Sequence, residues 1–305
     1  MSGHLLLIGS VLFGSYGIAV AQPSPDGDPP RFRVDTRLIL IPVTVTDTRG
    51  ANIGGLGKDR FTILDNRQPQ PIAAFYTEDS PASIGLVLDV SGSVKGALDR
   101  EKAAAHAILQ LSNPEDDFFL VTVSSNPGNL AGPAADAGKI EDLVRSQTAG
   151  GGTALCDTLY FALNQSRRRN RPRRALVVIS DGMDNHSRYP SRDVIRLAVE
   201  SDTQVYTIAI DSPRANVKGI PLAEIQRGLA FLEDLALKTG GLSVRLGESA
   251  NPSTAAGRIS SSIRNQYVIG YHSPDSGGSE KWHRIQVKVN LSKVNVYARS
   301  GYQSR

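Results

Sequence analysis

Cysteine is nearly absent from this chain, since Cys156 is the only one among 305 residues. No intramolecular disulfide can form, so the stability of the fold must come from its apolar core and from any metal that it binds. We expect Cys156 to be a buried, inert side chain rather than a reactive thiol. The five histidines do not have the spacing of zinc ligands, so they do not indicate a histidine-based metal centre.

Motifs of nucleotide-binding and hydrolytic enzymes are also missing. The sequence has no Gly-x-x-x-x-Gly-Lys phosphate loop and no Gly-x-Ser-x-Gly nucleophile elbow. The net charge of +4 is only mildly basic, and the arginine-rich segment 167–174 has no interleaved aromatic residues. We therefore expect a solvated surface at this segment and no nucleic-acid partner. Binding of an anionic partner by the arginines is the alternative.

Long apolar runs are confined to the N-terminus. Leu5–Val20 is mostly apolar, but it contains glycines and is short for a membrane span. Ala19-Val20-Ala21 is a small-x-small cleavage pattern, so residues 1–21 are predicted to be a signal peptide, although no Lys or Arg precedes the apolar run. An uncleaved anchor is the alternative. We expect residues 22–31 to be a flexible leader. After cleavage of the signal peptide, we expect an exported chain without a transmembrane span. Its expected location is the periplasm, or the medium or cell surface.

A short buried strand is predicted at Ile84–Leu88, because its apolar residues follow one another without alternation, as in strands that are covered on both faces. Asp89, Ser91 and Ser93 follow at alternate positions where this strand ends. In an open α/β sheet, ligands bind in the crevice beyond the carboxyl ends of the strands. Oxygen side chains gathered there can hold a hard divalent cation.

Two later loops carry similar side chains. Three glycines, Gly150–Gly152, allow a close backbone approach and precede the Thr153 hydroxyl at the start of a helical pattern. A second buried strand, Ala175–Ile179, is followed by Asp181 beside a glycine. Each loop alone is a weak signal, because such residues are common in turns. Their order on alternating strands and helices makes the combination specific.

Asp89-x-Ser91-x-Ser93, followed by Thr153 and then Asp181, resembles the metal-ion-dependent adhesion site of von Willebrand factor A domains, over roughly residues 82–264. The resemblance implies a Mg²⁺ ion, or alternatively Mn²⁺, at the top of a doubly wound sheet. It implies that the three hydroxyls bind the metal directly and that the two aspartates act directly or through water. In that family a carboxylate of the partner protein typically fills the sixth position.

A cation held largely by neutral hydroxyls keeps much of its charge and should attract an anionic oxygen. We therefore expect a protein partner that presents an acidic side chain. Candidate contacts with this partner lie on the same three loops: Gly92, Gly152, Gly182, Met183, Asp184 and His186. No residue is assigned a catalytic role. The alternative is that the Ser and Asp residues only form turns and caps, which both residue types favour.

Strand and helix patterns alternate from residue 81 to 265, which indicates a doubly wound, mostly parallel sheet with helices on both faces. The flanks, residues 32–80 and 266–305, show only β patterns. Because three strands rarely stand alone, we expect the flanks to pair into a smaller β-sandwich-like region. This layout is similar to exported bacterial proteins of the "VWFA-related" type, whose ends also carry Gln-Tyr-x-x-Gly-Tyr (here 266–271) and Arg-x-Gly-Tyr (here 299–302).

The sequence thus favours a non-enzymatic, metal-dependent module for adhesion or protein binding. One alternative is a structural scaffold whose β flanks or arginine-rich surface bind the partner. The other is a metal-dependent hydrolase or phosphotransferase that uses Asp89 as nucleophile. Enzymes of the haloacid dehalogenase type carry a second aspartate two residues after the nucleophile, and Ser91 occupies that place here. The identity of the ligand and the oligomeric state stay open.

Overall fold

The computed structural model describes residues 37–211, 219–275 and 281–304 of the chain. The predicted signal peptide and leader lie outside these residues. Within the described ranges, no helix combines the length and the apolar character that a membrane crossing requires.

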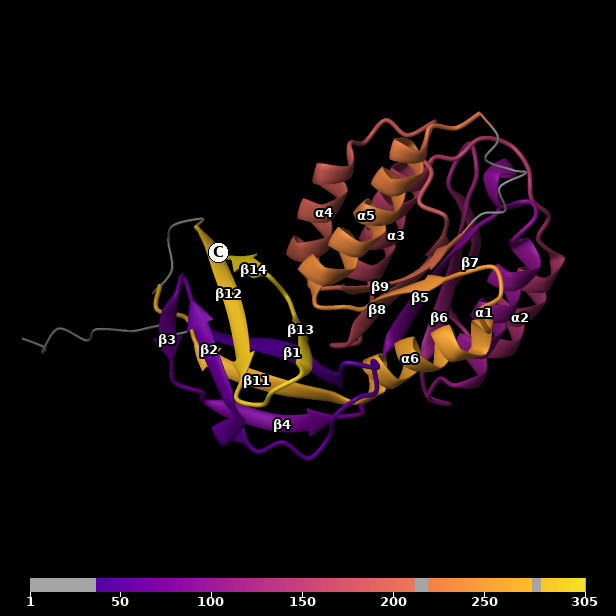
Figure 1. Ribbon diagram of the computed structural model, residues 1–305. Coiled ribbons are helices and arrows are strands. Elements are labelled where there is room, and N and C mark those ends of the chain that lie inside the picture. Colours follow the sequence, from indigo (N-terminus) through magenta and orange to yellow (C-terminus); the bar gives the residue numbers. More distant parts are fainter. Residues whose placement is uncertain (1–36, 212–218, 276–280, 305) are drawn as a thin grey trace, which may run out of the picture. The chain divides into compact units, whose positions relative to one another are not determined.

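The α/β domain is built on a six-stranded sheet in the order β10-β9-β8-β5-β6-β7 (Figure 1). Five of these strands are parallel, and β7 pairs antiparallel with β6 at one edge. The predicted mostly parallel sheet is therefore confirmed. The edge strand was not expected, because its glycines and proline are unusual in a strand. The strands are β5 (Ser83–Asp89), β6 (Asp117–Val123), β7 (Gly128–Ala135), β8 (Arg174–Ser180), β9 (Gln204–Ile210) and β10 (Ser243–Leu246).

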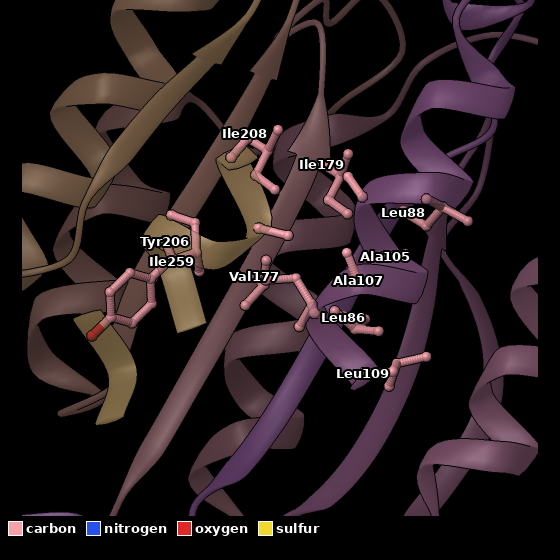
Figure 2. Close-up of a cluster of buried hydrophobic side chains, with 14 of the residues drawn as sticks. Leu86, Leu88, Ala105, Ala107, Leu109, Val177, Ile179, Tyr206, Ile208 and Ile259 are labelled. Carbon is pink, nitrogen blue, oxygen red and sulfur yellow. The ribbon is translucent and has the colours of Figure 1, made fainter. Parts of the chain in front are cut away.

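Helices cover both faces of this sheet, because successive apolar side chains of each strand point to opposite sides. Leu86 and Leu88 belong to the first core and Val87 to the second. Figure 2 shows part of the first core, where side chains from three neighbouring strands meet those of α1 and α6. The first core is covered by α1 (Leu98–Gln110), α2 (Ala137–Ser146) and α6 (Pro252–Arg264), and the second by α3 (Leu155–Arg167), α4 (Ser191–Glu200) and α5 (Leu222–Thr239).

Local signals in the sequence explain where several helices begin or end. The Asp136 carboxylate accepts the Lys139 backbone N–H at 2.8 Å before α2, and the Asn251 side chain accepts the Ser253 N–H at 2.9 Å before α6. At the end of α5, Gly240 adopts a left-handed conformation with φ of 83°.

The two flanks form a pair of four-stranded sheets, ordered β13-β1-β11-β4 and β14-β12-β2-β3. Each sheet contains strands from both ends of the chain, and β1 pairs antiparallel with both β11 and β13. The expected β region made from both flanks is therefore confirmed. Its strands are β1 (Leu38–Asp47), β2 (Phe61–Asp65), β3 (Gln68–Gln70), β4 (Ala74–Glu78), β11 (Gln266–His272), β12 (Trp282–Val289), β13 (Val294–Ala298) and β14 (Gly301–Gln303), with a short 3₁₀ turn at Lys58–Arg60.

The α/β domain begins after β4 and ends before β11, and these two strands are neighbours. The backbones of Glu78 and Gln266 are paired, so both connections leave the same sheet side by side. The Arg173 guanidinium donates hydrogen bonds to the carbonyls of Ser80 and Ile263, one on each connection. The domain is thus inserted between these two strands, and the same arginine binds both connections.

A fully buried carboxylate, Asp65, joins the two flanks. It accepts hydrogen bonds from the hydroxyls of Tyr271 at 2.7 Å and Tyr302 at 3.2 Å, and its other oxygen lies 2.9 Å from Nδ1 of His283. The two tyrosines are the last residues of the two C-terminal motifs noted in the sequence. The two motifs and His283 therefore connect one residue of the N-terminal flank with three strands of the C-terminal flank.

Replacing Asp65 with Ala should destabilise the protein by about 3–5 kcal/mol, because three buried polar groups lose a partner and each unsatisfied group costs about 1–3 kcal/mol. Urea unfolding of the full chain measures this change. Asp59, whose side chain is 81% exposed, provides the matched control, and Asp59→Ala should change the free energy of unfolding little. Equal losses in the two variants would contradict a joining role for Asp65.

Candidate metal centre

The first two of the three predicted loops are joined by backbone hydrogen bonds. The Gly92 N–H donates to the Gly151 carbonyl at 3.0 Å, and the Gly150 N–H donates to the Val90 carbonyl at 2.8 Å. A Cβ atom on Gly92 would lie only 3.0 Å from the Gly151 carbonyl oxygen, so a larger residue would press the loops apart. The glycines therefore allow the loop after β5 and the loop before α3 to lie in contact.

The second and third loops are joined around Thr153. Its backbone N–H donates to Oδ1 of Asn185 at 2.9 Å, and its carbonyl accepts the N–H groups of Asn185 at 3.0 Å and His186 at 2.9 Å. A Cβ on Gly152 would lie 2.5 Å from the His186 ring, so the absence of a side chain at this position makes room for the imidazole. Thr153 is thereby held in a fixed place, with its side chain buried.

The first and third loops are joined by Asp89, which is completely buried at the end of β5. One carboxylate oxygen accepts the Ser91 N–H at 2.9 Å, and the other accepts the Ser180 hydroxyl from the end of β8 at 2.6 Å. The Ser91 and Ser93 hydroxyl oxygens lie 3.1 Å apart. The Asp181 carboxylate accepts the Met183 N–H at 3.0 Å. Direct bonds thus connect each of the three loops with the other two.

We call the side chains of Asp89, Ser91, Ser93, Thr153 and Asp181 the oxygen cluster. Within it, burial and, as the second cause, repulsion by Asp181 together raise the pKa of Asp89 to about 6. Both carboxylates lie at the ends of neighbouring strands, away from water. Their mutual repulsion is the kind that a bound cation relieves.

The donor set of the oxygen cluster fits a hard divalent ion. Mg²⁺ and similar ions take oxygen ligands, and Mg²⁺ keeps several waters rather than entering an all-protein cage. Among the residues that the structure describes, no three His, Cys, Asp or Glu side chains are grouped so that they alone could hold a metal. A cation at this place would therefore depend on the Ser and Thr hydroxyls in addition to the aspartates.

The residues expected to contact a partner differ in their exposure. Gly92 and His186 are exposed and Gly152 is half-buried, whereas Gly182 is buried and Met183 is only 5% exposed. The half-buried Asp184 accepts the N–H groups of Cys156 at 3.0 Å and Ser187 at 3.1 Å, so its carboxylate orders the third loop. Cys156 is buried as expected, and burial raises the pKa of its thiol.

Three further side chains belong to this neighbourhood, and none of them was predicted to support the metal site. The Ser180 hydroxyl donates a hydrogen bond to Asp89, and the Asn185 side chain accepts one from the Thr153 N–H. Glu101 on α1 is fully buried, and both Asp89 and Asp181 act on it electrostatically. Ser180 could have been noticed as the polar last residue of an apolar strand. Glu101 occupies the apolar face of a helix, where a single acidic residue breaks the pattern.

Residues 84–183 match the family model described as von Willebrand factor type A domain. No curated protein matches the chain. Similar solved structures include the von Willebrand factor type A protein from Catenulispora acidiphila, at 12% identity and a TM-score of 0.48, covering 89% of this chain and 75% of that one. An aerotolerance-related membrane protein from Bacteroides fragilis NCTC 9343 has 16% identity and a TM-score of 0.47, and the match covers 60% of this chain and 98% of that one. Proximal thread matrix protein 1 from the mussel byssus, with a zinc-occupied MIDAS motif, has 13% identity and a TM-score of 0.49. This match covers 66% of this chain and 50% of that one.

The raised pKa of Asp89 predicts a pH dependence for the metal-free protein. Between about pH 4 and pH 6 the folded state holds a proton on Asp89 that the unfolded chain releases, so the free energy of unfolding should fall as pH rises through this window. The contribution is at most about 3 kcal/mol, from 1.36 kcal/mol per pKa unit. Urea unfolding in EDTA at several pH values measures it.

The variant Asp89→Asn should lose this contribution, while Asp99→Asn, at an exposed position, should keep the wild-type slope. If Asp89→Asn and the wild type show the same slope between pH 4 and pH 6, Asp89 does not titrate in this way.

Proposed function

We propose that this chain, whose residues 84–183 form a von Willebrand factor type A domain, is a non-enzymatic binding protein that captures a partner through a divalent cation. The observation that supports the proposal is the hydrogen-bonded contact between the three loops that carry the oxygen cluster. Mg²⁺ is the proposed ion and Mn²⁺ a substitute. The cation would supply an attachment point for an anionic oxygen of the partner.

The position of each residue supports a division of labour in this site. Ser91 and Thr153 are buried and held by hydrogen bonds of their own backbone N–H groups, so their hydroxyls are ready to coordinate without a large rearrangement. Asp89 and Asp181 would supply the negative charge. Gly92 and His186 lie at the exposed rim, where a partner carboxylate would approach. The partner is thus proposed to be a protein that presents an acidic side chain.

The arginine-rich segment offers less support for the scaffold alternative. Arg171 forms an ion pair with Asp117 at 2.6 Å, and the Arg169 guanidinium lies 4.7 Å from the centre of the Phe119 ring. Arg173 binds the two connections between the domain and the flanks, as described above. Several of these arginines therefore already serve contacts within the chain. They are less available to an anionic partner than the sequence suggests.

Nucleophilic catalysis by Asp89 is also disfavoured by its surroundings. The side chain is completely buried, and both of its oxygens accept short hydrogen bonds from Ser91 and Ser180. A nucleophile must reach the reacting atom of a substrate. The same burial suits a group that anchors the first and third loops. We therefore propose a binding function, and export to the cell envelope or medium, for the mature chain.

Titration calorimetry of the purified chain should detect one Mg²⁺ or Mn²⁺ ion per molecule. Asp89→Ala and Thr153→Ala should each weaken this binding strongly, because they remove a charged anchor and a hydroxyl ligand. Asp99→Ala, in which an exposed carboxylate is lost, should bind the ion as the wild type does. Equal affinity in all four proteins would refute the assignment of the oxygen cluster as the metal site.

Capture from a native envelope extract tests the second half of the proposal. A partner should bind the Mg²⁺-loaded wild type, leave in EDTA, return when Mg²⁺ is restored, and fail to bind the folded Thr153→Ala variant. Neutralising the partner's carboxyl groups chemically before capture should abolish binding. A partner that stays bound in EDTA and to Thr153→Ala would favour the scaffold alternative instead.

A further inference from the structure

The acidic residue Glu101 occupies a position that an apolar residue would normally fill. It lies in the first turns of α1, on the same helix face as Leu98, Ala105 and Ile108, all of which belong to the first core. Its exposed fraction is 0%. Acidic side chains are almost never fully buried unless they are paired. An alanine or leucine would continue the face, so the carboxylate calls for a physical explanation.

Neither carboxylate oxygen of Glu101 has a hydrogen-bond partner among the described residues. The charge of the adjacent Arg100 lowers the pKa of Glu101, but its guanidinium donates hydrogen bonds to the carbonyls of Asp211 at 2.8 Å and Gly247 at 2.9 Å. The backbone N–H of Asp89 acts on the Glu101 carboxylate, but without the geometry of a hydrogen bond to either oxygen. A buried carboxylate in this state has lost its hydration without a replacement.

The groups around Glu101 place it next to the oxygen cluster. Burial is the main cause that raises its pKa, and the charges of Asp89 and Asp181 raise it further. Three carboxylates therefore share one buried neighbourhood at the ends of β5 and β8. They are not grouped as a set of direct ligands, since no such trio exists among the described residues. An indirect contact between Glu101 and a cation in the cluster, through a bound water, agrees with this arrangement.

We propose that Glu101 is a positioning residue of the metal centre, and that its carboxylate accepts a hydrogen bond from a water molecule that the cation carries on its buried side. This inference rests on the proposed metal binding. The bound water would supply the missing hydrogen-bond donor for Glu101. Mg²⁺ suits this role because it prefers to keep part of its water shell. The exposed side of the cation stays free for the partner's carboxylate.

Two consequences follow for the protein. With the cation present, Glu101 adds a third negative charge and orients a bound water, so affinity for divalent ions is raised. Without it, the unpartnered carboxylate opposes folding. The same residue therefore has opposite effects on the metal-free and metal-loaded states, which a purely structural residue would not have.

The isosteric variant Glu101→Gln separates these effects. We expect its Mg²⁺ and Mn²⁺ affinity in titration calorimetry to fall about 10- to 100-fold, the usual range for the loss of a group that orients a metal ligand. In EDTA its melting temperature should lie above that of the wild type. The upward shift of the melting temperature on adding Mg²⁺ should be smaller than in the wild type. Glu115→Gln, at an exposed carboxylate, should match the wild type in all three measurements.

The outcomes distinguish this inference from the proposed function. If the wild type binds neither ion, both are overturned. If the wild type binds and Glu101→Gln binds with equal affinity, only the role of Glu101 is overturned, whatever happens to stability. Should Glu101→Gln and Glu101→Met both fail to fold, carboxyl-carbon NMR of the wild type decides. The Glu101 signal should shift with Mg²⁺ and saturate with metal binding, and an unchanged signal refutes the proposal.

Discussion

The candidate metal centre depends on the buried carboxylate of Asp89. One of its oxygens holds the backbone of Ser91, and the other holds the hydroxyl of Ser180 on the neighbouring strand. A single side chain therefore sets the position of the first loop relative to the third. Because the anchor is an acid beside Asp181, fixing the geometry also concentrates negative charge in a buried place. The arrangement that orders the loops is thus the one that attracts a cation.

Much of the fold could be predicted because its signals are local and periodic. Unbroken apolar runs mark strands covered on both faces, and the ends of Ile84–Leu88 and Ala175–Ile179 lie within a residue or two of β5 and β8. The need of three-stranded flanks for a partner surface predicted that both ends of the chain share a β region. The edge strand β7 has no such signal, since only its pairing with β6 makes it a strand.

The site could be predicted only as far as its motif extends. Asp89, Ser91, Ser93, Thr153 and Asp181 are recognisable by spacing, and the structure brings the loops that carry them into contact. The supporting roles of Ser180 and Asn185 were not predicted, because they depend on which groups of separate loops face each other. Met183 was predicted to contact a partner because it lies in the loop, yet its side chain is buried. Sequence position indicates the loop, whereas side-chain direction is a property of packing.

Three buried carboxylates in this chain differ in the number of hydrogen bonds that they accept, and this difference matches their structural or functional roles. Asp65 accepts hydrogen bonds from two tyrosines and lies beside His283, so both of its oxygens have partners and it joins the two flanks. Asp89 receives two donors but faces a like charge. Glu101 receives none among the described residues. A buried carboxylate with too few hydrogen-bond donors or with a like charge nearby destabilises the folded state, and a bound ligand can offset this free energy. The deficit is greatest where α1 meets the oxygen cluster, so that is where the fold has most to gain from a cation.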